Sequence, residues 1–152
     1  MPAFSFVKDQ TLYVHEYPLS SGQTKGIRKI LQKHSAYFSE QIKNIDLCNC
    51  SLSDASFAEL LEGLHQLEDI SSFTYQSNEL GEESVKWLLD MIRNDDEPNN
   101  FRTVNLVSVK TSSRVMAPLL SKLAGHEQLK QLRISDVRLS EGQVFKLVGE
   151  II

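Results

Sequence analysis

Two cysteines separated by one asparagine, Cys48 and Cys50, are the side chains of this sequence best suited to metal or redox chemistry. Thiolates bind zinc and exchange disulfides. A metal site needs more ligands than two neighbouring cysteines, however, and two cysteines with a one-residue gap cannot build a disulfide framework. We therefore expect no metal and no cofactor here, and ask whether Cys50 fills a structural position instead.

Catalytic side chains show no arrangement typical of an enzyme. The four histidines, His15, His34, His65 and His126, fall in separate segments, and two of them sit near expected helix ends, where an imidazole can bond the last carbonyls. The sequence contains no glycine-rich phosphate loop, no HExxH and no GxSxG. The sequence therefore predicts a protein that is not an enzyme.

Length and charge narrow the remaining classes. The chain of 152 residues is long enough for one domain with a real core. A net charge of −4 argues against a nucleic-acid or membrane-surface partner, and no apolar run has the length that spans a membrane. The first residues lack the layout of a signal peptide, and the cysteine usage favours a reducing compartment. We expect a cytoplasmic protein, with the nucleus as the alternative.

The elements that must position these residues repeat along the chain. Taking Cys50 as an anchor, apolar residues stand at offsets −8, −5, −3 and +2, and the same offsets recur around Asn78, Val109 and Val137. The residues are Ile42, Ile45, Leu47 and Leu52; Ile70, Phe73, Tyr75 and Leu80; Phe101, Val104, Leu106 and Thr111; and Leu129, Leu132, Ile134 and Leu139. Thr111 alone departs from the apolar pattern, so the sequence predicts four equivalent strands.

Each predicted strand is followed by a predicted helix in the same frame. Offsets +7, +10, +11 and +14 carry an apolar stripe at helical spacing. The stripes are Phe57, Leu60, Leu61 and Leu64; Val85, Leu88, Leu89 and Ile92; Met116, Leu119, Leu120 and Leu123; and Val144, Leu147, Val148 and Ile151. Helix-capping residue types precede them at Ser53, Gly81, Ser112 and Ser140, the last with Gln143 as a capping box.

This pattern, L-x-x-L-x-L-x-x-N/C-x-L followed by a helix, resembles the leucine-rich repeat. The spacings of 28, 31 and 28 residues between anchors are similar to those of its ribonuclease-inhibitor-like class. The resemblance covers repeats at 42–69, 70–100, 101–128 and 129–152. It implies an α/β fold: a right-handed β–α solenoid with a parallel sheet on the concave side and helices on the convex side.

The resemblance also gives the anchor a structural role. In this family the anchor side chain points inward and bonds to the backbone of a neighbouring turn. Cys50 and Asn78 are able to do this. Val109 and Val137 are not, so we expect the third and fourth turns to be satisfied in another way.

Residues 1–41 lie outside the repeats, and we interpret them as an atypical first repeat or N-terminal cap. Two short strands that could form a hairpin precede an expected helix at 23–40. Aligning this segment with the frame puts Leu12, His15 and Tyr17 in strand positions. At the other end the apolar pattern stops without a polar cap, which suggests a fragment of a larger protein whose uncapped end can self-associate.

Three features interrupt the regular pattern. The polar segment 93–100 carries the three extra residues of the second repeat and is expected to be an exposed loop. Pro118 should either delay the start of the third helix to near Val115 or bend it. Trp87 lies outside the buried stripe and is expected to pack against an adjacent helix, with a role as a partner anchor as the alternative.

The resemblance implies that residues between the buried strand positions project from the concave face, where a protein partner could bind, as it could at the loops that end the strands. Because side chains alternate along a strand, twelve positions share this face. They are Asn44, Asp46, Cys48, Ser72, Thr74, Gln76, Thr103, Asn105, Val107, Gln131, Arg133 and Ser135. The set holds no aromatic cluster of the kind that dominates tight interfaces, so a solvated face that binds nothing is the alternative.

We therefore expect a non-catalytic protein-interaction module, or a scaffold segment of a larger intracellular protein, that binds neither nucleic acid nor the membrane interior. A branch of the resembling class suggests a second possibility, a regulator of an enzyme such as a GTPase-activating protein, for which Arg102, Arg114 and Arg133 are candidate arginines. A third is an actin-regulating repeat domain of the cytoskeleton.

Overall fold

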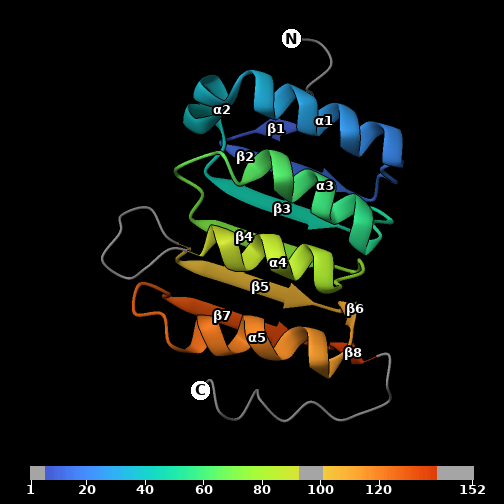
Figure 1. Ribbon diagram of the computed structural model, residues 1–152, viewed down its shortest axis with the longest axis vertical. Coiled ribbons are helices and arrows are strands. Elements are labelled where there is room, and N and C mark those ends of the chain that lie inside the picture. The colour runs from blue at the N-terminus through green and yellow to red at the C-terminus, as the bar shows by residue number, and fades with distance from the viewer. Residues whose placement is uncertain (1–5, 93–100, 140–152) are drawn as a thin grey trace.

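The computed structural model describes residues 6–92 and 101–139, which form a mostly parallel sheet with helices packed on it (Figure 1). The main sheet has six strands in the order β1-β2-β3-β4-β5-β7, and β6 and β8 form a separate pair. The strands are β1 (Val7–Lys8), β2 (Thr11–His15), β3 (Asn44–Cys48), β4 (Ser72–Gln76), β5 (Thr103–Val107), β6 (Lys110–Thr111), β7 (Gln131–Ser135) and β8 (Arg138–Leu139). The helices are α1 (Ser21–Lys33), α2 (Ser35–Gln41), α3 (Asp54–Leu64), α4 (Glu82–Met91) and α5 (Ser113–Ala124).

The long strands pair in one continuous register. β2, β3, β4, β5 and β7 are parallel, and equivalent positions lie opposite one another, so that Ile45, Phe73, Val104 and Leu132 form one row. The side-by-side alignment of the four strands that was predicted from apolar spacing is thereby confirmed. A residue at one offset in the frame always meets the same offset in the next strand–turn–helix unit.

The apolar positions of the frame build one core between the sheet and the helices. Strand residues such as Leu47, Tyr75 and Leu106 are fully buried, as are Phe57 and Leu61 on α3. Aromatic rings continue the contact between units, because Phe57 stacks on Tyr75 with ring centroids 4.0 Å apart. The sheet residues Leu132 and Ile134 of β7 are only half-buried, since β7 is the edge strand of the described sheet.

The Cys50 and Asn78 side chains link each turn to the preceding unit. Asn78 Oδ1 accepts hydrogen bonds from the backbone N–H of Cys50 (2.9 Å) and of Leu52 (3.2 Å), while its Nδ2 donates to the carbonyl of Leu47 (3.4 Å). The thiol of Cys50 donates in the same way to the carbonyl of Val14, at 3.1 Å. Buried backbone groups that would otherwise be costly are thus satisfied by side chains one unit away.

Where valine replaces the polar anchor, backbone groups pair directly instead. Beside Val109, the N–H of Lys110 donates to the carbonyl of Asn78 (3.0 Å) and the N–H of Leu80 donates to the carbonyl of Lys110 (2.9 Å). The short strands β6 and β8 continue this second ladder. The later turns therefore exchange a side-chain bridge for a strand pair.

A left-handed residue marks the same point in every turn. Glu16, Asn49, Ser77, Ser108 and Asp136 each have φ between 50° and 55°. These residues directly follow β2, β3, β4, β5 and β7, so the five turns share one backbone geometry. The recurrence extends the unit to the N-terminal segment.

That N-terminal unit corrects the predicted alignment. Leu12 lies opposite Ile45 and Val14 lies opposite Leu47, so Leu12 and Val14 are the buried strand residues. The frame that placed His15 and Tyr17 in strand positions was wrong by three residues. Tyr17 follows the strand and is 45% exposed.

The N-terminal helix also differs from its prediction. Ser20 and Gln23 form a capping box, so α1 begins at Ser21 rather than at residue 23. The helical run then breaks at His34, where φ is −119°, and continues as the separate helix α2. The expected hairpin is present as the antiparallel pair of β1 and β2.

Two of the three irregular features fall within the described residues. Ser112 caps α5 through Val115 N–H, so this helix begins at Ser113 and includes Pro118 rather than starting later. Trp87 packs against the core and lies 4.8 Å from the ring of His65 at the end of α3, as expected for contact with an adjacent helix. The loop 93–100 lies outside the described residues. So do Ser140, Gln143 and the stripe Val144, Leu147, Val148 and Ile151.

The N-terminus of α4 is capped by the preceding helix. Its own N-cap residue, Gly81, has no side chain, and Asp54 of α3 takes over this role. Asp54 Oδ1 accepts from the N–H groups of Gly81 (3.0 Å) and Ser84 (2.9 Å), and Oδ2 accepts from Glu83 N–H (3.1 Å). A Cβ at position 81 would lie 2.5 Å from Asp54 Cγ, so glycine is needed for this close approach.

Replacing Leu61 by aspartate should unfold the protein. Leu61 is 0% exposed, and an unpaired carboxylate there costs several kcal/mol, comparable to the whole stability of a small domain. Thermal unfolding followed by circular dichroism measures the effect. Ala55→Asp places the same residue on an exposed position of α3 and should leave the melt nearly unchanged. A cooperative, unshifted melt of Leu61→Asp would contradict the assigned core.

Replacing Asp54 by alanine should destabilise the protein by about 1–3 kcal/mol, because three helix N–H groups lose their acceptor. Asp54→Asn keeps one acceptor oxygen and should lose less. Urea unfolding gives both values. Equal stability of Asp54→Ala and the unmodified protein would show that water replaces the cap without cost.

Candidate functional site

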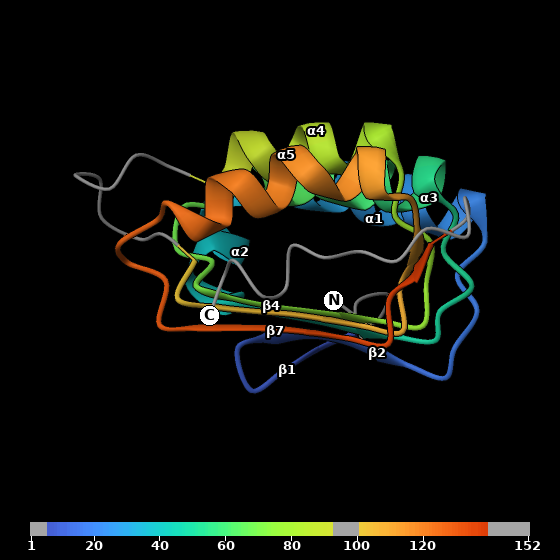
Figure 2. The ribbon, with the colours of Figure 1, turned by 90° about the horizontal axis from the view of Figure 1, so that it is seen from below.

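One face of the sheet carries no described helix, and we call it the open face. Figure 2 shows α1, α3, α4 and α5 together on the other side of the strands. Along each strand the side chains alternate, with buried residues toward the helices and partly exposed residues on the open face. The open face thus presents three side chains from each of five strands.

The structure brings all twelve predicted binding residues together on this face. In-register pairing arranges them in three rows that cross the strands. The rows are Asn44, Ser72, Thr103 and Gln131; Asp46, Thr74, Asn105 and Arg133; and Cys48, Gln76, Val107 and Ser135. Gln131 and Arg133 are exposed and the other ten are partly exposed. The surface is small, polar and mostly uncharged.

Sequence reasoning missed the contribution of β2. Thr11, Tyr13 and His15 extend the three rows by one residue each, because they pair with Asn44, Asp46 and Cys48. Their alternation with Leu12 and Val14 was a readable signal, but the misplaced frame concealed it. The open face therefore has fifteen residues, and these include an exposed aromatic side chain, Tyr13, of a kind that the twelve lacked.

A compact cluster stands at the β2 edge of the open face. The ring of Tyr13 is stacked on that of His15 with centroids 4.0 Å apart, and Tyr13 is 45% exposed. His15 Nε2 lies 2.9 Å from Asp46 Oδ1. Glu16 follows directly and accepts a hydrogen bond from Asn49 Nδ2 at 2.6 Å. This edge joins an exposed aromatic ring to two carboxylates.

The opposite edge is basic. Arg133 lies in the same row as Asp46 on the outermost parallel strand, β7, and makes no ion pair with any residue in the ranges 6–92 and 101–139. Between these edges stand Thr74 and Asn105, whose Nδ2 donates to Thr74 Oγ1 at 3.1 Å. The middle row thus runs from an acidic, aromatic end through neutral amide and hydroxyl groups to a cation.

The two cysteines have different environments. Cys50 is buried, and burial raises the pKa of its thiol to about 12. Cys48 is partly exposed on the open face, and the pKa of its thiol is raised by burial and then by the charges of Glu16 and Asp46. Both thiols are free, and within the described ranges no three His, Cys, Asp or Glu side chains gather as metal ligands do. Cys50 is a packing and hydrogen-bonding residue.

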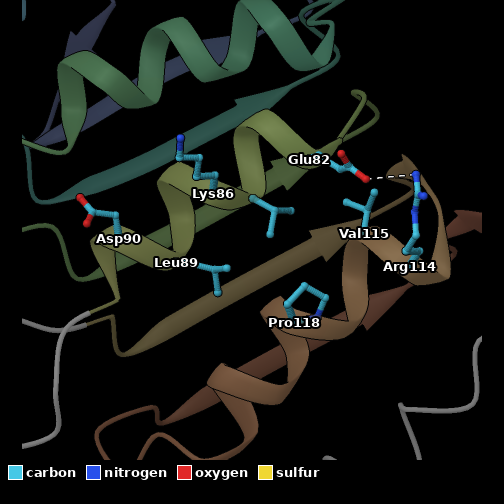
Figure 3. Close-up of a pocket in the computed structure, with 8 residues that line it drawn as sticks. Glu82, Lys86, Leu89, Asp90, Arg114, Val115 and Pro118 are labelled. Atoms are coloured by element: carbon cyan, nitrogen blue, oxygen red, sulfur yellow. Dashed lines mark ion pairs between the residues drawn. The ribbon is translucent and has the colours of Figure 1, made fainter.

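A groove of about 540 Å³ lies on the helical side of the sheet, between α4 and α5 (Figure 3). It is lined by Glu82, Val85, Lys86, Leu89, Asp90, Arg114, Val115 and Pro118. Arg114 pairs with Glu82 at 3.0 Å, but their side chains are 77% and 69% exposed, so the pair contributes little. Two acidic residues, Glu82 and Asp90, and two basic residues, Lys86 and Arg114, line this groove, so its formal charges cancel.

The three arginines considered for GTPase activation are separated. Arg102 precedes β5, Arg114 is the second residue of α5, and Arg133 lies on the open face. The three candidates therefore lie on different elements.

Comparisons with known proteins add no relative. No protein-family model matches the chain, and no curated protein matches its sequence. Within the described ranges, none of the helices combines the length and hydrophobicity needed to cross a bilayer.

Alkylation should distinguish the two cysteines. In the folded protein at about pH 8, iodoacetamide should modify Cys48 and leave Cys50 unmodified, because Cys50 is buried and its thiol remains protonated. Mass spectrometry of time points reports each site. In urea both residues should react at similar rates, which serves as the control. Rapid native labelling of Cys50 would contradict its assigned place in the core.

Proposed function

We propose that this chain is a leucine-rich-repeat-type solenoid that serves as a non-catalytic protein-interaction module, with the open face as its binding surface. The observation that carries the proposal is a continuous face of fifteen outward residues on five in-register strands, which no described helix covers. A rigid surface of this kind displays variable side chains on an invariant backbone.

The repeated unit supports the solenoid interpretation. Strand, left-handed turn residue, anchor and helix recur in one order, and each unit packs on its sequence neighbour. In this proposal the units wind as a right-handed β–α superhelix with the open face on its concave side. The polar anchors Cys50 and Asn78 support the likeness to the N/C position of the repeat.

The size of the open face indicates what it can hold. Five strands at ~4.8 Å spacing span ~19 Å, and three rows along the strands span ~13 Å, which gives an area on the order of 250 Å². A stable interface between globular proteins buries roughly 800 Å² on each partner. The open face alone therefore suits a peptide segment or a transient contact better than a whole domain.

The two free cysteines are compatible with the reducing interior of a cell, so we place the module in a larger cytoplasmic or nuclear protein. Its net charge of −4 and the mixed charges of the open face argue against a nucleic-acid partner. The expected partner is a protein.

Thr74→Arg should strongly weaken partner binding without unfolding the protein. Thr74 lies at the centre of the open face, and a long cation there obstructs all three rows. Peptides selected from a random twelve-residue phage library against the unmodified chain provide the ligands. Fluorescence polarisation should show at least about tenfold weaker binding to Thr74→Arg, with an unchanged melting curve.

Ala55→Arg is the matched control, because it adds the same side chain to an exposed position on the helical side. It should leave binding intact. The proposal fails if the library yields no binders, or if every binder is indifferent to Thr74→Arg.

A further inference from the structure

We infer that the open face binds an extended partner segment laid across the strands, with a basic residue at the β2–β3 edge and an acidic residue at Arg133. This inference rests on the proposed function and adds the chemistry and polarity of the partner.

The middle row supplies the track for such a segment. Tyr13, Asp46, Thr74, Asn105 and Arg133 lie opposite one another in four successive parallel pairings. They therefore form one continuous row across the strands. A ligand that follows this line meets every strand once, and both charged ends lie on its path.

The β2–β3 edge is built to receive a cation. Asp46 uses Oδ1 in its contact with His15, and its Oδ2 has no hydrogen bond to another residue in the described ranges. Glu16 adds a second exposed carboxylate at the end of β2. The partly exposed Tyr13 ring supplies a π-face, which attracts a guanidinium or ammonium group beside the carboxylates. Aromatic and acidic recognition thus coincide at one end of the row.

Two nearby charges shape this end without cancelling it. Lys8 of β1 lies opposite Thr11, which precedes Tyr13 by two residues on β2. Lys8 therefore stands at the end of the adjacent row. Lys43 is held by the Asp69 carboxylate at 2.9 Å and is thereby neutralised. Asp46 and Glu16 together outweigh the single charge of Lys8, so a cation is favoured over an anion here.

The β7 edge is suited to a carboxylate. Arg133 is exposed, and its planar guanidinium can bind a carboxylate through two hydrogen bonds. The neighbouring Asp136 lies in the turn after β7, where it accepts a hydrogen bond from Ser108 Oγ at 2.8 Å. Arg133 is thus the cation of the middle row, and no described acid pairs with it.

The distance between the edges sets the spacing in the partner. Asp46 and Arg133 are three strand spacings apart, ~14 Å, and Tyr13 and Arg133 are four spacings apart, ~19 Å. An extended chain advances ~3.3 Å per residue and points alternate side chains to one face. The basic and acidic residues of the partner should therefore lie about four or six positions apart.

The centre of the row favours an extended segment over a helix. An amphipathic helix binds through an apolar stripe that enters a hydrophobic groove. Thr74 Oγ1 and Asn105 Nδ2 are polar groups instead, and both can donate hydrogen bonds to the backbone carbonyls or polar side chains of an extended chain.

The test uses the peptides selected from the random library. Their sequences should show a basic and an acidic residue at the predicted spacing and in one chain order. Asp46→Asn and Arg133→Gln should each weaken binding by about tenfold, and binding should fall as salt concentration rises. Asp136→Asn changes a carboxylate outside the middle row and should have little effect. A synthetic peptide with its two charged residues exchanged should bind the unmodified protein at least about tenfold more weakly.

Reversing both ends of the row provides the decisive comparison. The double variant Asp46→Arg with Arg133→Glu should prefer the charge-exchanged peptide over the original, and its circular dichroism melt should show that it is folded. Because the charge-exchanged peptide is also tested on the unmodified protein, the outcome does not depend on any one variant folding.

Two failures can be told apart. The first failure is that Thr74→Arg weakens peptide binding but the peptides carry no charge pattern, or that Asp46→Asn, Arg133→Gln and charge exchange leave binding unchanged. The inferred polarity is then wrong while the proposed function stands. If no binder is sensitive to Thr74→Arg, the proposed function fails and the inferred polarity fails with it.

Discussion

The in-register parallel pairing of β2, β3, β4, β5 and β7 is the constraint on which the rest of this structure depends. A strand with apolar residues on one side cannot bury them alone, so each unit must cover its neighbour. The common register lets every pair of neighbouring units bury its apolar residues in the same way. Because equal offsets meet, the buried Phe73 lies opposite Ile45 on one side and Val104 on the other. A slip of one residue would turn every apolar side chain toward the open face.

Side-chain hydrogen bonds between neighbouring units hold the turns in place. Asn78 bridges backward to the turn at Cys50, and Asp54 bridges forward to the first turn of α4. Both satisfy backbone N–H groups that lie where helices or strands end and that have no partner within their own element. The Val109 turn reaches the same result with a short strand pair. The fold therefore requires that these groups be satisfied and accepts more than one way of doing so.

The elements that repeat were predictable from sequence, and those that do not repeat were the source of the errors. Apolar offsets located β3, β4, β5 and β7 and the helices α3, α4 and α5, because burial imposes the same spacing on each unit. The N-terminal unit was misaligned because its anchor position holds Tyr17, a residue unlike the Asn or Cys that marks the turn elsewhere.

The contacts between units were less accessible to sequence reasoning. The cap that Asp54 provides for α4 joins residues about thirty positions apart, and nothing in the local pattern of either segment specifies it. The cluster of Tyr13, His15 and Asp46 could be recognised only after β2 had been placed beside β3 in the correct register. The twelve outward positions were found because they follow from strand alternation alone, whereas their edge-to-edge polarity also needed the neighbouring strand.

The two faces of the sheet are under different constraints. Inward residues are constrained by packing on both sides, and a change such as a charge at Leu61 affects the whole core. Outward residues occupy equivalent backbone positions but carry no packing duty beyond their row, so Arg133 or Thr74 can vary with little effect on stability. Specificity is then a matter of which side chains stand in line. Here one end of the line has an aromatic ring and a carboxylate, its centre is neutral, and its other end is basic. In the binding mode that we propose, this order gives a bound segment a direction as well as a place.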